Sequence, residues 1–302
     1  MRIRYFSMLG IRGLDGLQKD MPHRDIDLVV VHGGFARGKT AFLDTIAAAK
    51  EKVSDYGTPD SRWDALVGSN SGSAKVRLDW EPSAAELTRA GASAQEGLLS
   101  AESILGKVAV PPEHPKLLQA LLAQRGDAER GSVHYMHDTR DLSGPLSYGA
   151  NEAAVNERLT TRNTKFAEIY DMLDQPQFAA ARALGAARFA EIFPDLELVG
   201  LKRTGISFVP GLRNKSTGVE RTYNTLSSSE RHAFLMAYYT AKSPIVESGL
   251  LLDAPELGFG DDGAVQLVRA MLRWTTKTQI IVATASNAVR AMPEVAHVVD
   301  LP

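Results

Sequence analysis

Residues 28–40 read Leu28-Val-Val-Val-His-Gly-Gly-Phe-Ala-Arg-Gly-Lys-Thr40, an apolar run that leads into a glycine-rich turn. The β-branched run Leu28–Val31 is typical of a buried strand. Good helix formers follow the turn at 40–50, with apolar residues at helical spacing. A strand, a tight turn and a helix in this order favour an α/β fold.

The turn matches the pattern G-x-x-x-x-G-K-[ST], which is typical of a phosphate-binding loop. In such a loop successive backbone N–H groups converge on phosphate oxygens, and the helix N-terminus adds partial positive charge. A lysine supplies charge for the β- and γ-phosphates, and the hydroxyl after it binds Mg²⁺. The sequence therefore predicts an ATP and Mg²⁺ site that comprises Gly33, Gly34, Phe35, Ala36, Arg37, Gly38, Lys39 and Thr40.

A second apolar run, Leu250-Leu-Leu-Asp253, ends in an acid. A carboxylate at the end of a strand beside a phosphate-binding loop can hold Mg²⁺ through water. We therefore predict that Asp253 and Thr40 hold the metal. The alternative is that Asp253 only caps the following turn.

Strand and helix patterns alternate in the last third of the chain, which indicates a parallel sheet in a P-loop α/β fold. The patterns predict strands at 2–14, 28–31, 74–80, 197–204, 205–210, 249–253, 279–284 and 295–301, and helices at 40–50, 84–90, 115–124, 151–173, 176–192, 227–239 and 262–275.

The amino-acid composition excludes some kinds of site and argues against some classes of protein. The 302 residues include no cysteine, which excludes disulfides and cysteine-ligated metals. The 34 basic and 36 acidic residues give a net charge of −2, which does not support a strongly basic nucleic-acid binder. We find no signal peptide and no apolar run long enough to span a membrane, so we expect a cytoplasmic protein.

Further motifs resemble the ABC-type ATPase heads of the RecF/SMC/OLD group, which are often labelled AAA-family ATPases. Leu226-Ser-Ser-Ser-Glu230 is similar to the signature motif of these heads. Residues 33–40 are similar to their Walker A loop, 250–257 to their Walker B segment, and 279–286 to the strand that ends in their switch histidine. The resemblance implies one head over 1–302, with a mostly parallel core sheet and an antiparallel β subdomain. It implies a core lobe at 1–60 and 195–302 and a mainly helical insertion at 80–194.

The resemblance implies a head-to-tail dimer in which the signature of one head contacts the γ-phosphate held by the other. Ser227, Ser228, Ser229 and Glu230 would then act in trans. The partner would be a second copy or a related head. The alternative is a structural role, in which the serines cap a helix and Glu230 completes a capping box. Both readings can hold at once.

Three positions depart from the family pattern. Ala254 stands where the family has its catalytic glutamate, Ala285 where it has the switch histidine, and Ser229 where the signature has a glycine. Alanine can neither polarise water nor hydrogen-bond a phosphate. We therefore assign no catalytic residue. Glu256, two residues beyond Ala254, is considered as a substitute base. An engineered change at Ala254 is an alternative to natural loss.

Other residues give weaker signals. His134 and His137 form an i, i+3 pair that is more often structural than metal-binding. Asp261 and Asp262 either belong to a dimer-contacting loop or cap a helix. Basic residues that form either a DNA-facing strip or a solvated face are Arg2, Arg4, Arg12, Lys202, Arg203, Arg213 and Lys215.

These observations predict an ATP-dependent dimerisation switch or assembly subunit with weak or no hydrolysis. One alternative is an active DNA-linked ATPase of the repair or phage-defence type. Another is a static, nucleotide-bound scaffold. A third is a regulatory partner for a separate effector protein.

Overall fold

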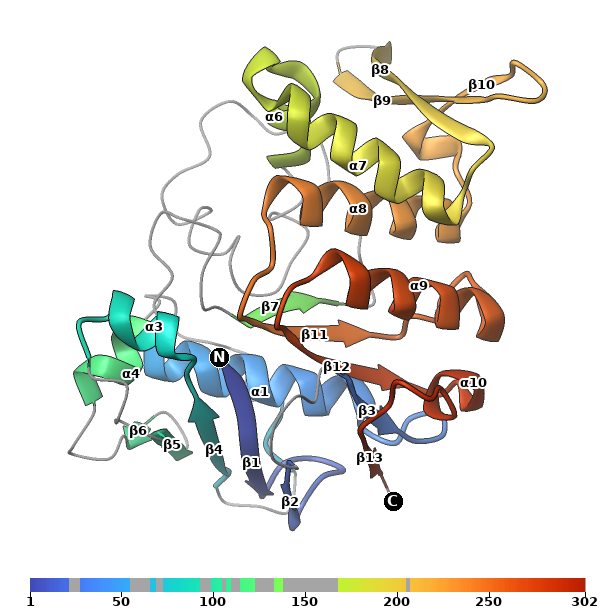
Figure 1. Cartoon of the computed structure of the whole chain (residues 1–302). Coiled ribbons are helices and arrows are strands. Elements are labelled where there is room, and N and C mark those ends of the chain that lie inside the picture. The colour runs from blue at the N-terminus through green and yellow to red at the C-terminus, as the bar shows by residue number, and fades with distance from the viewer. Residues whose placement is uncertain are drawn as a thin grey trace. The chain divides into compact units, whose positions relative to one another are not determined.

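Continuous apolar runs form the central strands of a parallel sheet. In the computed structural model β3 (Leu28–His32), β12 (Gln279–Thr284) and β11 (Gly249–Asp253) are almost entirely buried and pair in parallel. With β13 (His297–Asp300) and β7 (Val133–Met136) they give the order β13-β3-β12-β11-β7 among the described strands (Figure 1). Because all these pairs are parallel, the carboxyl ends of the strands lie at one edge.

The structure describes residues 1–21, 28–54, 66–68, 73–92, 99–104, 107–109, 115–122, 133–137, 168–204 and 207–301. The chain divides into two compact units, each described by itself below. The first unit comprises Met1–Asp138, Ile245–Pro255 and Thr276–Pro302, and the second comprises Thr139–Pro244 and Glu256–Thr275.

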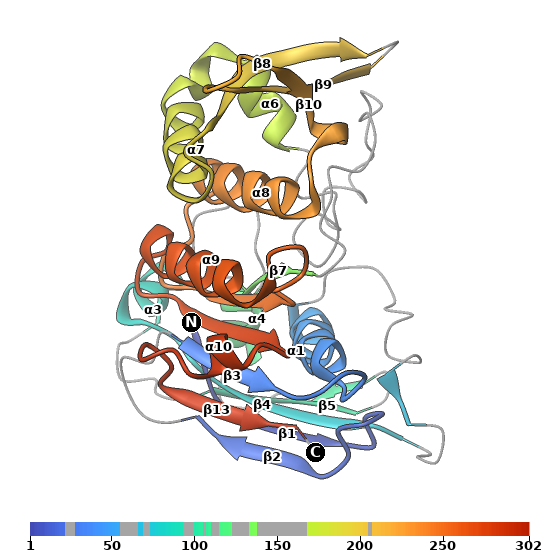
Figure 2. The ribbon, with the colours of Figure 1, turned by 90° about the vertical axis from the view of Figure 1, so that its right-hand side faces the viewer.

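The first unit also contains an antiparallel sheet, with the order β2-β1-β4-β5-β6 among the described strands. Figure 2 shows β1, β4 and β2 side by side. Its strands are β1 (Arg2–Leu9), β2 (Leu17–Asp20), β4 (Lys75–Glu81), β5 (Leu99–Ile104) and β6 (Lys107–Ala109). The helices in the described part of this unit are α1 (Lys39–Ser54), α3 (Ala84–Arg89), α4 (Pro115–Leu122) and α10 (Asn287–Arg290).

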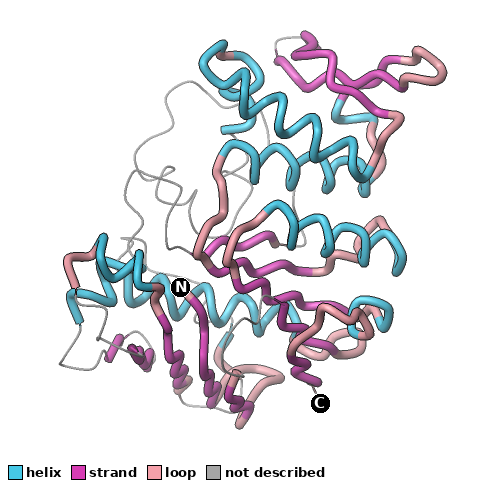
Figure 3. The backbone as a smooth tube through the Cα atoms, in the orientation of Figure 1, coloured by secondary structure: helices cyan, strands magenta, loops and turns pink. Residues whose placement is uncertain are grey.

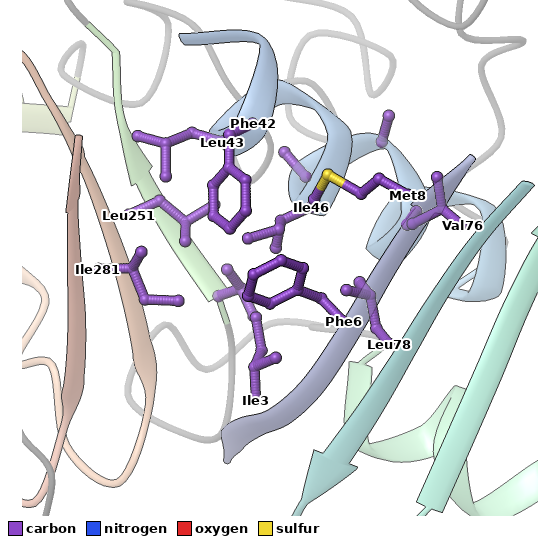
Figure 4. Close-up of a cluster of buried hydrophobic side chains, with 14 of the residues drawn as sticks. Ile3, Phe6, Met8, Phe42, Leu43, Ile46, Val76, Leu78, Leu251 and Ile281 are labelled. Atoms are coloured by element: carbon purple, nitrogen blue, oxygen red, sulfur yellow. The ribbon is translucent and has the colours of Figure 1, made fainter. Parts of the chain in front are cut away.

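Helix α1 lies in the core of the first unit and contacts both of its sheets (Figure 4). Phe42 packs edge-on against Phe6 of β1, with ring centroids 4.9 Å apart. Leu251 of β11 and Ile281 of β12 belong to the same buried cluster. Burying a side chain of this size stabilises a fold by about 2–3 kcal/mol, so this core fixes the start of α1 relative to the parallel strands.

The second unit is built on helices that lie beside a small antiparallel sheet (Figure 3). Helix α7 (Ala179–Ile192) packs closely on α8 (Ser228–Lys242), because a Cβ at Gly185 would lie only 2.7 Å from the Tyr238 ring. The sheet has the order β10-β9-β8 and comprises β8 (Leu196–Thr204), β9 (Ser207–Asn214) and β10 (Glu220–Thr222). The other helices are α6 (Glu168–Asp174), η2 (Pro176–Phe178), η3 (Tyr223–Thr225) and α9 (Gly260–Trp274).

The structure confirms the α/β class, the parallel core sheet and the antiparallel subdomain. The boundary between units differs from the division proposed from the sequence. Residues up to Asp138 belong to the first unit, where β4–β7 are strands, so 80–138 is not mainly helical in its described part. Residues 195–244 belong to the second unit rather than to the lobe that contains the phosphate-binding loop. Most of the helix predicted at 151–173 lies outside the described residues.

Candidate functional site

The loop between β3 and α1 has the backbone shape of an anion-binding turn. Ala36 and Gly38 both adopt positive φ, 59° and 83°, within six residues of the end of the strand. Helix α1 begins at Lys39, and the Phe42 amide donates to the Gly38 carbonyl at 2.8 Å. A turn of this kind directs backbone N–H groups inward at a helix N-terminus, where negative charge is favoured.

Lys39 places its ammonium group over this loop. Its Nζ donates to the carbonyl oxygens of Gly33 at 2.9 Å and Gly34 at 2.6 Å. An ammonium has three N–H donors, so a third hydrogen bond is available to an incoming oxygen. The loop thus holds a positive charge in place before any ligand binds.

Contacts below the loop support it. A Cβ at Gly38 would lie 3.2 Å from Leu14, and one at Gly33 would lie 3.2 Å from Leu301. The Leu301 amide donates to the His32 carbonyl at 2.8 Å. The last described residue of the chain therefore lies directly against the first residues of the loop.

A polar cluster that the sequence did not predict joins β13 to the same loop. Arg290 donates to Asp300 at 2.9 Å, and His32 Nδ1 lies 3.4 Å from the other oxygen of that carboxylate. The hydrogen bond from Arg290 is the main cause that lowers the pKa of Asp300 below its usual value. Arg290 and Asp300 are ten residues apart in sequence. His32 is far from both in sequence, and it lies beside Asp300 because β13 pairs with β3.

Asp253 is the final residue of β11 and is 1% exposed. It lies two residues beyond Leu251, which packs in the α1 core, so its side chain lies on the same side of the sheet as α1. Thr40 lies in the first turn of that helix. A carboxylate and a hydroxyl are oxygen ligands of the type that Mg²⁺ prefers, so these residues fit the predicted metal.

His137 lies at the same sheet edge, which its sequence context did not reveal. Leu252 pairs with Met136, so His137 follows β7 at the level where Asp253 ends β11. The Tyr135 hydroxyl donates to Asp44 of α1 at 3.0 Å, and the His137 ring packs against Tyr135 with centroids 5.4 Å apart. Thr40 lies one helical turn before Asp44. The end of β7 is thereby directed toward the start of α1.

The two histidines considered as a metal pair do not act together. Along a strand, successive side chains point to opposite faces, so His134 faces away from the side that Tyr135 and His137 share. Within the described ranges, no group of three histidine, aspartate or glutamate side chains is placed to hold a metal ion.

Alanine occupies the two edge positions where the resemblance expects catalytic groups. Ala254 has a positive φ of 43°, and its amide donates to the Ala283 carbonyl at 2.9 Å. Ala285 is exposed and precedes Ser286, whose side chain caps α10 through the Val289 amide. Neither methyl group can accept a proton.

In the second unit, the predicted signature forms the N-terminus of α8. Ser227 is the N-cap, and it forms a capping box with Glu230. Burial raises the pKa of Glu230, but hydrogen bonds from Ser227 and Arg221 outweigh it and lower the pKa overall. The capping interpretation is therefore confirmed. The trans-acting role of Ser227, Ser228 and Ser229 remains a prediction.

The turn before α9 lies against this helix start. A Cβ at Gly258, which has a φ of 82°, would lie 2.8 Å from Ser228 Cβ and 2.9 Å from the Ser229 amide nitrogen. His232 Nδ1 lies 3.2 Å from the Leu257 carbonyl oxygen. The carbonyl of Glu256 accepts hydrogen bonds from the amides of Phe259 and Gly260. Asp261 and Asp262 are in the first turn of α9, but Phe259 is its N-cap, so the capping prediction for these acids is wrong.

Several residues of the considered basic strip are engaged with acidic or carbonyl oxygens. Arg4 lies 3.0 Å from Glu81, and Arg213 lies 2.6 Å from Glu197. Lys202 pairs with Glu220, and Lys215 donates to the Pro194 carbonyl at 2.7 Å. These pairs favour the solvated charged face over a DNA-facing strip.

Among the described residues, no helix is both long and apolar enough to cross a membrane.

Comparisons with known proteins identify the fold. No family model and no curated protein matches the chain. An SMC head bound to the C-terminal winged-helix domain of ScpA matches with a TM-score of 0.62 and 14% identity, over 99% of this chain and 94% of that one. The SMC head domain from Thermotoga maritima matches with a TM-score of 0.54 and 14% identity, over 99% and 94%.

A third solved structure gives the same result. It is an Smc head domain with an extended coiled coil, bound to the C-terminal domain of ScpA and derived from Pyrococcus furiosus. It matches with a TM-score of 0.57 and 13% identity, over 99% of this chain and 92% of that one. The chain therefore shares the fold of these SMC head domains.

Proposed function

We propose that this chain is an ATP-binding head whose nucleotide occupancy drives association of two heads, with weak or no hydrolysis. The observation that carries the proposal is the loop at Gly33–Thr40. Its positive-φ turn, its helix N-terminus and the Lys39 ammonium combine at one point. Together these features favour binding of a polyphosphate.

Asp253 and Thr40 would hold Mg²⁺ at the same sheet edge. The metal, when bound, neutralises charge on the β- and γ-phosphates.

Weak hydrolysis follows from the residues at the ends of β11 and β12. A water molecule that attacks the γ-phosphate must be oriented, and its proton must be accepted. Ala254 and Ala285 can do neither. Glu256 lies two residues beyond Ala254, and its backbone carbonyl accepts hydrogen bonds in the turn before α9. We therefore expect ATP to stay bound for a long time.

Association is the proposed output. The start of α8 presents Ser228 and Ser229 at a helix N-terminus, which suits a phosphate from a second head. The partner is a second copy or a related head. Two of the similar SMC heads were solved with parts of ScpA bound, which supports an assembly protein as a further class of partner.

The test is the mass of the protein by light scattering, without nucleotide and with Mg·ATP. We expect the mass to double with Mg·ATP and to stay at the monomer value in a Lys39→Ala variant. A monomer mass in the wild type, despite ATP binding measured by calorimetry, would contradict the switch and favour a static scaffold.

A further inference from the structure

The end of β7 carries an imidazole at the level of the carboxylate that ends β11. Leu252 pairs with Met136, so in the same parallel register Asp253 is opposite His137. Paired residues of neighbouring parallel strands point to the same face of the sheet, and such strands lie about 4.8 Å apart. Asp253 and His137 therefore lie side by side at the carboxyl edge of the sheet.

Both side chains lie on the face of the sheet that α1 contacts. Leu251 and Tyr135, two residues before Asp253 and His137 on their strands, are buried in the cluster that includes residues of α1. Side chains two residues apart on a strand point to the same face. All of these residues belong to the first unit.

A series of contacts orients the imidazole. The His137 ring packs edge-on against the Tyr135 ring, with centroids 5.4 Å apart. The Tyr135 hydroxyl donates to Asp44 of α1 at 3.0 Å, and Thr40 lies one helical turn before Asp44. Helix α1 contacts both β7 and β11. An imidazole, a carboxylate and a hydroxyl thus come from three elements that pack together at this edge.

This set of groups differs from an all-oxygen site. Mg²⁺ prefers oxygen ligands, whereas an imidazole nitrogen favours divalent first-row transition metals, whose affinity for a given site rises from Mn²⁺ to Co²⁺ and beyond. Within the described ranges no three histidine, aspartate or glutamate side chains are placed to hold a metal ion. A bound nucleotide must therefore supply the remaining ligands through its phosphate oxygens.

We propose that the nucleotide site holds its divalent ion through the nitrogen of His137 as well as through Asp253 and Thr40, and so takes a first-row transition-metal ion in preference to Mg²⁺. The inference rests on the proposed nucleotide binding, and it names the class of metal that accompanies the nucleotide. Co²⁺ is the probe ion.

The first test measures the affinity for a non-hydrolysable ATP analogue by calorimetry, with Co²⁺ and with Mg²⁺. We expect the Co²⁺-to-Mg²⁺ ratio of affinities to be about tenfold or more larger in the wild type than in His137→Gln, because glutamine offers an amide oxygen in place of the nitrogen. Comparing two proteins cancels the affinity of each metal for the analogue itself. An unchanged affinity with Mg²⁺ shows that His137→Gln is folded.

The matched control is His297→Gln. His297 is also a half-buried histidine of the first unit, but it begins β13 and so lies at the amino edge of the sheet. We expect its Co²⁺-to-Mg²⁺ ratio to equal that of the wild type. An equal fall of the ratio in both variants would overturn the assignment to His137.

Proton NMR tests the nitrogen ligand directly. The imidazole N–H proton of a histidine bound to paramagnetic Co²⁺ resonates far outside the ordinary range. We expect one such exchangeable signal from the wild type with Co²⁺ and the analogue, and none when the analogue is omitted. The signal should persist in His297→Gln and be absent from His137→Gln. Its absence from the wild type would overturn the proposal without reference to any variant.

The outcomes separate this inference from the proposed function. If the wild type binds the analogue with Mg²⁺ but its Co²⁺-to-Mg²⁺ ratio matches that of His137→Gln, the nitrogen ligand is wrong and the proposed function stands. If the analogue binds with neither metal, both proposals fail.

Discussion

The loop between β3 and α1 and the ends of β11 and β12 belong to the same edge of one parallel sheet, yet they carry different chemistry. The loop has a lysine, a helix N-terminus and two left-handed residues that favour an anion. Strand β11 ends in the buried carboxylate of Asp253. An alanine follows each strand, Ala254 after β11 and Ala285 after β12, where the resemblance implies a side chain that acts on water. In the proposed function, binding and hydrolysis therefore depend on separate groups, and a change in one group leaves the other in place.

The largest expected effect comes from restoring the missing groups. Because general acid–base catalysis contributes about 10²- to 10⁴-fold, the Ala254→Glu, Ala285→His double variant should raise ATP turnover by about 100-fold or more. Ala285 is exposed and Ala254 is half-buried. Phosphate release measures the effect.

The control for this gain is the same pair of changes combined with Lys39→Ala, which should remain at the baseline. If the restored protein binds ATP as tightly as the wild type but turns over no faster, the two alanines are not the reason for slow hydrolysis.

The next largest effect is on ATP affinity, and it distinguishes the charge of Lys39 in the loop from that of Asp253 at the end of β11. Lys39→Ala removes charge-assisted hydrogen bonds and should lower ATP affinity by about 10- to 100-fold, with or without Mg²⁺. Asp253→Asn should lower affinity only when Mg²⁺ is present, because its proposed contact is through the metal. Calorimetry with and without a chelator distinguishes these results. Equal Mg²⁺ dependence in wild type and Asp253→Asn would exclude Asp253 from the metal site.

A smaller effect is expected on the stability of the fold, because the loop and the end of β11 each contain a strained backbone residue. Ala36 and Ala254 have φ values of 59° and 43°, in the left-handed region that favours glycine. Ala36→Gly and Ala254→Gly should each stabilise the protein by about 1 kcal/mol or less, because relief of strain is partly offset by the greater freedom of glycine when unfolded. Urea denaturation is the measurement. A loss of stability in either variant would show that its methyl group makes contacts worth more than the strain.

The smallest effect lies beside the loop. Arg290 and His32 lower the pKa of Asp300, so its carboxylate stabilises the folded state above its unfolded pKa of about 4. That contribution is lost as the pH falls through the folded value. Because Asp300 is 56% exposed, it amounts to about 0.5 kcal/mol or less. Asp300→Asn should be slightly less stable than the wild type at pH 7 and equal to it at pH 2. A difference that persists at pH 2 would assign the effect to packing.

The sequence predicted those parts of the fold that carry strong local patterns. The apolar runs of β3, β11 and β12 were predicted because strands buried on both faces read as continuous apolar segments. The turn between β3 and α1 was predicted because a glycine-rich segment separates an apolar run from good helix formers. The binding of polyphosphate by this turn, and of Mg²⁺ by Asp253, remain predictions.

The sequence did not predict features that depend on pairing. Strands β5, β6 and β7 are short and partly polar, and pairing with neighbours, rather than propensity, makes them strands. His137 lies level with Asp253 because of the register in which β7 pairs with β11. That register depends on the neighbouring strand and not on the local sequence of β7 alone. The Arg290–Asp300–His32 cluster likewise requires the pairing of β13 with β3.

We propose that the loop retains ATP because the ends of β11 and β12 lack the groups that act on water. The most direct test is to incubate the purified protein with labelled Mg·ATP, remove free nucleotide by rapid gel filtration, and identify the bound nucleotide after one hour. We expect it to be ATP, still bound in about one equivalent per chain. Recovery of ADP and phosphate within minutes would exclude long-lived ATP occupancy and identify the protein as an active ATPase.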